Sequence, residues 1–174
     1  MRELTSEVLV AHEPVTVLRT ADLDAIVARA RSVPRRRARI LLHGSLDDVM
    51  QEMMIVMTRG QYVPPIWNDR SPKSYLVLSG SFFLVKFDAS GEVTDSIRLA
   101  ADDPKDPFFA RINSPMWHMS IAETPDAVFL ETLLGPHQGT VFADWAPAAD
   151  SGPAGRAFFE RICGRCGIGS EPVS

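Results

Sequence analysis

The chain lacks several features that would place it in a common functional class. It has no excess of basic residues, since its formal net charge is −4 and its pI is near 5.5, whereas nucleic-acid binding needs a basic field. Its first residues show no basic region followed by an apolar run and a small-residue cleavage site, as a secretory signal would. No stretch holds the roughly 18 apolar residues that span a bilayer. With only two cysteines, the chain is predicted to be cytoplasmic and to bind neither nucleic acid nor a membrane.

Lysine is also scarce, with three residues against fifteen arginines, and this makes Lys73 distinctive. The one strongly basic run is Arg35-Arg36-Arg37 with Arg39. We interpret it as the solvated start of a strand, with a phosphate-binding group as the alternative. The remaining composition, 45% hydrophobic and 23% charged over 174 residues, predicts one globular domain that buries a core without disulfide or metal staples.

Short apolar runs separated by glycine, proline and aspartate dominate the chain. Strands are expected at residues 8–10, 15–18, 38–42, 49–58, 61–63, 74–78, 81–87, 92–99, 108–112, 116–122 and 127–133. The Met-rich run at 49–58 is apolar at both alternating positions, so both of its faces should be buried. Helices are expected from Thr20 to just before Pro34 and at 154–162, and Gly91 should close a hairpin turn at a positive φ. This pattern predicts an all-β jelly-roll barrel that encloses a ligand cavity. Its expected parts are an N-terminal arm (1–37), a barrel (38–150) and a helical tail (151–174).

One segment has the spacing of a metal-binding motif without its ligands. Residues 60–80 fit the first cupin motif, G-x5-H-x-H-x4-E-x6-G, with glycines at both ends. The three ligand positions carry Ile66, Asn68 and Lys73 in place of two histidines and a glutamate. His118 stands where the second cupin motif supplies its histidine.

Several further segments resemble, in their order and spacing, the WbuC family of cupin-fold metalloproteins, which are encoded near bacterial O-antigen and other polysaccharide genes. The matching segments are Arg37-Ala38-Arg39 to Leu42-His43-Gly44-Ser45, Gln51 with Met53, Tyr62 to Pro65, Lys86-Phe87-Asp88 with Gly91, Trp117-His118, Leu130-Glu131 with Gly135-Pro136, and Asp144-Trp145-Ala146-Pro147. The resemblance covers roughly residues 35–150 and implies a cupin double-stranded β-helix that pairs as a homodimer through its N-terminal strands. In such a family the metal ligands would fall on Ile66, Asn68, Lys73 and His118, so this chain departs from the family at three of four positions.

The substituted positions argue against the usual metal. Zinc, iron and manganese sites need at least three good ligands, typically imidazole or carboxylate. Ile66 offers none and Asn68 only a neutral oxygen, while the ammonium of Lys73 would repel a dication about 4 Å away by several kcal/mol at an effective dielectric near 20. We therefore predict no cofactor. The alternative is a divalent metal (Fe, Zn, Mn or Ni) held by relocated ligands. These ligands would come from His118, Asn68, His43, Asp69 or Glu131.

Loss of the ligands leaves a cavity with other reactive groups. Strand alternation turns Lys73, Tyr75 and His118 into the same interior, and Tyr62 is expected to join them. A lysine in an apolar cavity has a lowered pKa and serves as a general base or Schiff-base nucleophile, while histidine transfers protons near neutral pH. The predicted catalytic residues are His118, Lys73, Tyr62 and Tyr75. The predicted substrate-binding residues are Asn68, Trp67, His43, Gln51, Glu131 and Ile66.

Several of these residues also have a purely structural interpretation. Lys73 follows a polar loop and would then point to solvent. Trp67 would be an ordinary packing residue, and His118 a core histidine bonded to a backbone carbonyl. Cys163 and Cys166 have the spacing of a zinc or redox pair, but the sequence contains no second pair, and we interpret them as reduced or crosslink-prone thiols.

Three functional hypotheses follow from these residues. The first is a metal-independent isomerase, epimerase or lyase that transfers a proton on a small polar molecule, such as a sugar nucleotide or another intermediate of polysaccharide or secondary-metabolite biosynthesis. The second is a non-catalytic module that binds a small molecule, which the apolar Ile66 at a ligand position favours. The third is a metalloenzyme with relocated ligands around His118.

Overall fold

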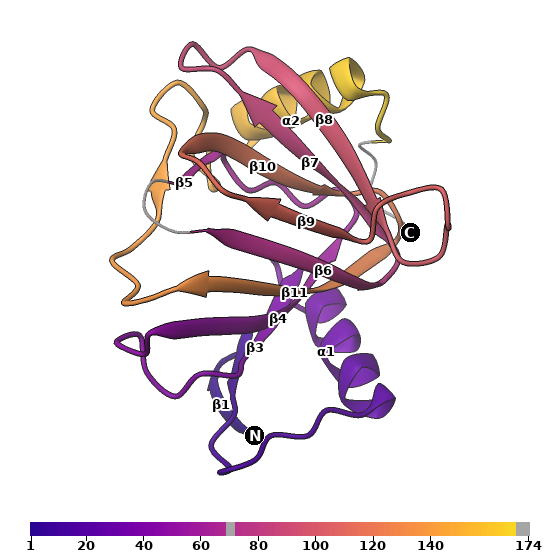
Figure 1. The fold of residues 1–174 in the computed structure, drawn as a ribbon. Helices are drawn as coiled ribbons and strands as arrows, with labels where there is room; N and C mark the ends of the chain where they lie inside the picture. Colours follow the sequence, from indigo (N-terminus) through magenta and orange to yellow (C-terminus); the bar gives the residue numbers. More distant parts are fainter. Residues whose placement is uncertain (69–71, 170–174) are drawn as a thin grey trace.

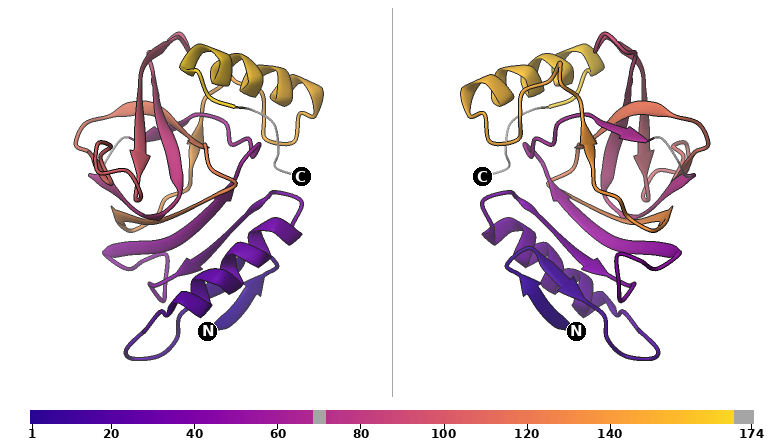
Figure 2. Two further views of the ribbon diagram at one scale, coloured as in Figure 1. Left: turned by 90° about the vertical axis from the view of Figure 1, so that its right-hand side faces the viewer. Right: turned by 90° about the vertical axis from the view of Figure 1, so that its left-hand side faces the viewer.

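The chain folds into two β-sheets with one helix on the outer face of each (Figures 1 and 2). The structure is a computed structural model that describes residues 1–68 and 72–169. In these residues sheet A has seven strands in the order β1-β2-β3-β4-β11-β6-β9, and sheet B has five in the order β12-β5-β10-β7-β8. The strands are β1 Arg2–Thr5, β2 Val8–Val10, β3 Arg37–Leu41, β4 Met50–Thr58, β5 Ile66–Asn68, β6 Lys73–Ser79, β7 Ser81–Phe87, β8 Val93–Ala100, β9 Phe109–Ile112, β10 Met116–Ala122, β11 Asp126–Leu134 and β12 Val141–Phe142, and the helices are α1 Thr20–Ser32 and α2 Pro153–Cys166.

The strand order is that of a cupin jelly roll. Strands far apart in the sequence lie side by side, with β4 beside β11, β11 beside β6 and β5 beside β10. These pairs are antiparallel, whereas β2 pairs with β3 in parallel. The two sheets enclose one apolar core, as a double-sheet jelly roll does. The all-β cupin fold predicted from the sequence is therefore confirmed.

Most of the expected strands and both helices are present, but two short runs are not strands. Residues 61–63 lie outside the strands, because they lead directly into Pro64 and Pro65, which cannot donate a backbone hydrogen bond to a neighbouring strand. Residues 15–18 are also irregular, and Val15 is 76% exposed. Apolar runs of three or four residues predict a strand only where a partner strand exists.

Helix α1 covers the outer face of sheet A along β3, β4 and β11 (Figure 2). Its Ile26 packs with Met54 and Val56 of β4 in one cluster, while Ile55 and Met57 turn inward to the barrel core. Both faces of β4 are therefore buried along residues 53–57, as this apolar run predicts.

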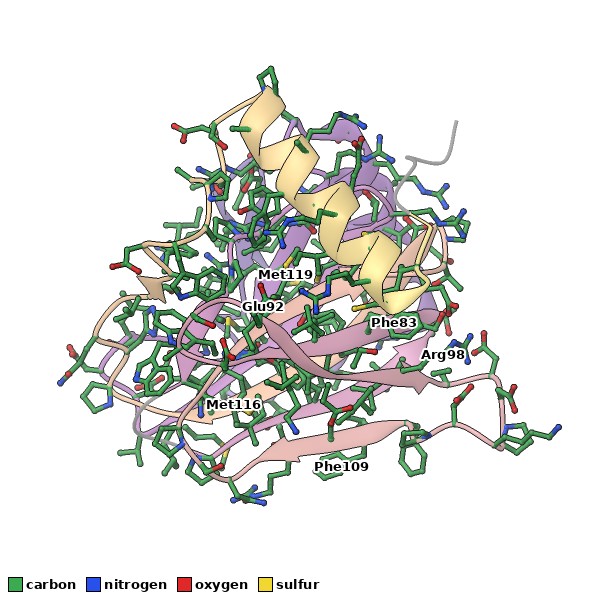
Figure 3. All side chains as sticks on the ribbon, turned by 90° about the horizontal axis from the view of Figure 1, so that it is seen from above. Phe83, Glu92, Arg98, Phe109, Met116 and Met119 are labelled. Atoms are coloured by element: carbon green, nitrogen blue, oxygen red, sulfur yellow. The ribbon has the colours of Figure 1, made fainter. Side chains whose placement is uncertain are left out.

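Helix α2 covers the outer face of sheet B. Its Phe158 and Ile162 pack with Met119 of β10, and Phe83 of β7 borders the same cluster. Figure 3 shows the helix crossing the strands that carry Met119 and Phe83. Within residues 1–68 and 72–169, no helix is long and apolar enough to cross a membrane.

Candidate functional site

One hydrogen bond between Tyr75 and His118 connects the inner faces of the two sheets. Tyr75 comes from β6 of sheet A and His118 from β10 of sheet B, and the phenol oxygen lies 3.1 Å from His118 Nε2. The Tyr75 ring packs edge-on against Phe82 and Phe129 of the apolar core. Both Tyr75 and His118 are 1% exposed. The hydrogen bond therefore lies in a water-poor interior, where it is stronger than in water.

An ion pair between Lys73 and Glu131 lies beside this hydrogen bond. Lys73 Nζ is 3.5 Å from Glu131 Oε2, and it lies 5.9 Å from the centre of the Tyr75 ring. Glu131 of β11 stands directly opposite Tyr75 in the strand register, and Lys73 is two residues before Tyr75 on the same face of β6. The side chains of Lys73 and Glu131 are 10% and 12% exposed. The ion pair is thus the more accessible end of the cluster, and the interpretation that Lys73 points to solvent is wrong.

Burial and charge keep the inner pair neutral. Burial, reinforced by the ammonium of Lys73, lowers the pKa of His118 from 6.5 to about 3. Burial, reinforced by the carboxylate of Glu131, raises the pKa of Tyr75 well above 10. Near pH 7 the imidazole and the phenol are therefore both uncharged. Among the described residues, buried Nδ1 of His118 has no hydrogen-bond partner.

The side chains around His118 do not fit the metal of the cupin motif. Nε2 of His118 is already bonded to Tyr75, the hydrocarbon side chain of Ile66 stands opposite it on β5, and Lys73 adds a positive charge. Over residues 1–68 and 72–169, no three His, Cys, Asp or Glu side chains are arranged to hold a metal ion. A dication at His118 would lack ligands and face an ammonium, which disfavours binding.

Two of the relocated ligands considered from the sequence have other partners. Glu131 pairs with Lys73, and His43 is bonded to the backbone of Glu52. Asp69 lies outside the described residues.

Two of the former ligand positions face the cluster as predicted. Strand β5 pairs with β10 so that Ile66 stands opposite His118 and Asn68 opposite Met116. Cross-strand partners share one face of a sheet, and Asn68 is 8% exposed. The spacing of the motif therefore placed these positions correctly, although their chemistry has changed.

The expected position of Tyr62 in the barrel is wrong. Its hydroxyl donates to the carbonyl of Pro147 at 2.6 Å, and its ring packs against Phe158 and Phe159 of α2. The expectation assumed strand alternation through residues 61–65, but this segment is not a strand. Tyr75 is the tyrosine of the barrel cluster.

Trp67 likewise lies on the opposite side of sheet B from His118. It stands opposite Trp117 in the register, and the two rings are 5.2 Å apart. Trp117 in turn packs against Trp145, beneath α2. Neighbouring residues of a strand face opposite ways, so the inward direction of Ile66 turns Trp67 outward. Its expected place in the ligand cavity is wrong, and its packing interpretation is confirmed.

His43 and Gln51 support the connection between β3 and β4. Nδ1 of His43 lies 2.9 Å from the carbonyl oxygen and 3.1 Å from the nitrogen of Glu52. The Gln51 amide donates to three carbonyls of loop 45–48, at 2.8 to 3.2 Å. These hydrogen bonds stabilise the connection between β3 and β4. The predicted role of both side chains in binding substrate stays a prediction.

The sequence placed Glu131 among the substrate-binding residues but missed its pairing with Lys73. The two residues belong to strands that are adjacent in the sheet but distant in the chain. Only the register of β6 against β11 brings their charges together.

A family model described as a domain of unknown function (DUF6016) matches residues 18–99. That range covers α1, strands β3 to β7 and β8 up to Leu99, but it ends before His118 and Glu131. No curated protein matched the chain.

The solved structures similar to the chain include three with TM-scores below 0.5. A protein with a double-stranded β-helix domain from Klebsiella pneumoniae has a TM-score of 0.47 and 16% identity over 62% of this chain and 80% of its own. An oxalate oxidase in complex with the substrate analogue glycolate has a TM-score of 0.49 and 13% identity over 80% of this chain and 69% of its own. Peruvianin-I, a cysteine peptidase from Thevetia peruviana latex, has a TM-score of 0.43 and 16% identity over 54% of this chain and 55% of its own. The match therefore spans about half of that chain.

Proposed function

We propose that the chain binds a small polar metabolite at the accessible end of the barrel cluster and transfers a proton on it without a metal ion. The observation that supports this is the set of ionisable groups Lys73, Glu131, Tyr75 and His118 beside the apolar core of the barrel. Burying charged and polar side chains costs free energy, and such groups cluster at functional sites more often than elsewhere.

The environments of the four side chains suggest their roles. With its lowered pKa, His118 is neutral and serves to orient the Tyr75 hydroxyl rather than to remove a proton. Glu131 is the accessible base, and its carboxylate would take a proton from a carbon next to a carbonyl group of the ligand. Lys73 would stabilise the negative charge that develops on the carbonyl oxygen. Where that carbon carries a hydroxyl group, transfer of the hydroxyl proton to the carbonyl oxygen and return of the carbon-bound proton from Glu131 to the former carbonyl carbon complete an isomerisation.

This assignment changes the role expected for Lys73. The sequence suggested a deprotonated lysine acting as a base or nucleophile. The structure instead pairs Lys73 with the carboxylate of Glu131 at 3.5 Å. Lys73 is therefore proposed as an electrostatic partner of the reacting group.

A non-catalytic binding module is the second candidate. Tyr75 and His118 are 1% exposed, and Ile66 presents an apolar surface beside them. A ligand bound at Lys73 and Glu131 would then be held but not converted. The substrate class, a sugar nucleotide or another biosynthetic intermediate, is part of the proposal under either candidate.

Deuterium exchange separates the two candidates without knowledge of the product. Sugar nucleotides and small carbonyl metabolites are first screened for those that raise the melting temperature of the protein. Each hit is then incubated with the protein in D₂O, and loss of a ligand C–H signal is followed by proton NMR. The proposal expects exchange by the native protein and a loss of roughly 100-fold or more in Glu131→Gln.

Lys86→Met is the matched control, because Lys86 forms a comparable but exposed ion pair with Asp95 at 3.1 Å. It should exchange the ligand at the native rate. Ligand binding without exchange would overturn the proposed reaction in favour of the binding module, and undiminished exchange in Glu131→Gln would reject Glu131 as the base.

The homodimer and the WbuC-like assignment stay as proposals. Strand β1 forms one edge of sheet A, and all four of its residues are exposed. Such an edge offers free backbone groups to a second copy. Light scattering after size-exclusion chromatography would give the mass of a dimer if the N-terminal strands pair, and a monomer mass would reject it.

A further inference from the structure

Two arginines lie on the part of sheet A that α1 does not cover. Arg37 and Arg39 alternate along β3 with Ala38 and Ile40, whose side chains pack in the α1 cluster. Arg37 and Arg39 therefore face the other side of the sheet. There they stand opposite Met57 and Ile55 of β4 in the register, and Arg39 is exposed while Arg37 is partly buried.

Neither guanidinium is neutralised. In the part of the chain that the structure describes, no ion pair or side-chain hydrogen bond reaches Arg37 or Arg39, and the carboxylate of Glu7 pairs with Arg35 at 3.9 Å. Burial lowers the pKa of Arg37 and the charges of Arg39 and Arg35 lower it further, while the carboxylate of Glu7 partly offsets them. A solvated strand start would leave its arginines exposed to water. Arg37 is instead partly buried, and the charges of Arg35 and Arg39 act on it.

We propose that Arg37 and Arg39 form a binding site for the phosphate or diphosphate group of a small metabolite. Two arginines at alternate positions of one strand lie about 7 Å apart, measured between Cα atoms. Guanidinium forks at this spacing can bind one tetrahedral anion from two sides, and arginine matches phosphate with paired hydrogen bonds. The anion would add negative charge at a place where three arginines outnumber the carboxylate of Glu7.

The site stands independently of the proposed reaction. Arg39 lies on the same inward face as Glu131, but β4 separates their strands, so the two positions are on the order of 10 Å apart. An extended ligand could place its phosphate on the arginines and its reacting end at Glu131. That link rests on the proposed function, whereas phosphate binding itself does not.

Pyrophosphate alone is the probe for the site. Phosphorus-31 NMR titration and thermal unfolding are run on the native protein, with sulfate and sodium chloride at equal ionic strength as comparison ions. Variants Arg37→Gln and Arg39→Gln should each weaken pyrophosphate binding roughly tenfold or more, the usual loss for a hydrogen bond to a charged group. Arg156→Gln, which removes one positive charge on α2, should bind as tightly as the native protein.

Arg37→Gln should also melt no lower than the native protein without ligand, because it removes an unpaired charge that is partly buried. As a measurement that needs no variant, pyrophosphate should protect Arg37 and Arg39 from phenylglyoxal, detected by mass spectrometry of peptides. Equal binding by all variants, equal stabilisation by sulfate, or no protection would overturn the proposal. Unchanged pyrophosphate binding in Glu131→Gln would keep the site even if the proposed reaction fails.

Discussion

A double-mutant cycle on Lys73 and Glu131 tests the centre of the site. At 3.5 Å, the attraction between the two charges is about 5 kcal/mol at an effective dielectric near 20. Most of this is offset by the cost of removing both groups from water. Removing one partner leaves the other charge buried alone, so Glu131→Gln and Lys73→Met should each lower the free energy of unfolding by about 3 kcal/mol. The double variant should lie within about 1 kcal/mol of the native protein, because it buries no unpaired charge.

The measurement is urea unfolding at pH 7, followed by far-UV circular dichroism and extrapolated to water. The exposed pair of Lys86 and Asp95 provides a matched cycle. Their nitrogen and oxygen atoms are closer, at 3.1 Å, but the side chains are 36% and 49% exposed. Their coupling free energy should therefore stay below about 1 kcal/mol.

Additive effects at Lys73 and Glu131 would refute this reasoning. Additivity would mean that the two charges do not interact in the folded protein. A coupling free energy no larger than that of Lys86 and Asp95 would likewise show that burial does not strengthen the ion pair of Lys73 and Glu131.

Three further outcomes are expected. Because the pKa of His118 is about 3 in the folded chain and near 6.5 when unfolded, the unfolded chain binds an extra proton between these values. Stability should therefore fall by about 1.4 kcal/mol for each unit that pH drops below 6.5, and urea unfolding from pH 4.5 to 7.5 should show that His118→Gln removes this slope. Gly91 has φ of +85°, and a Cβ there would lie 2.6 Å from the Trp145 ring. Gly91→Ala should therefore lower the free energy of unfolding, measured by thermal unfolding, by about 2 kcal/mol or more. A smaller loss would contradict the close contact. Burial raises the pKa of Cys163 to about 12, so Cys166 alone should react with a thiol reagent at pH 8, and rapid labelling of Cys166→Ser would disprove this.

Features set by neighbouring residues were predictable from the sequence. Helix α1 ends before Pro34, and the β7–β8 hairpin turns at Gly91, whose φ is positive. The burial of both faces of β4 followed from its apolar run at residues 53–57. In each case the decisive residues lie within a few positions of one another, so the local sequence pattern predicts the local structure.

The sequence by itself determined that the chain is a cupin barrel whose former ligand positions carry Ile66, Asn68 and Lys73. Only the tertiary structure decided what that change produced. It turned Tyr62 away beneath α2, brought Tyr75 to His118 from a strand 43 residues distant, and placed Glu131 beside Lys73. These contacts depend on which strands pair and in which register. Register depends on which face of each strand the core buries and on the turns that join the strands, so it involves residues far apart in the chain.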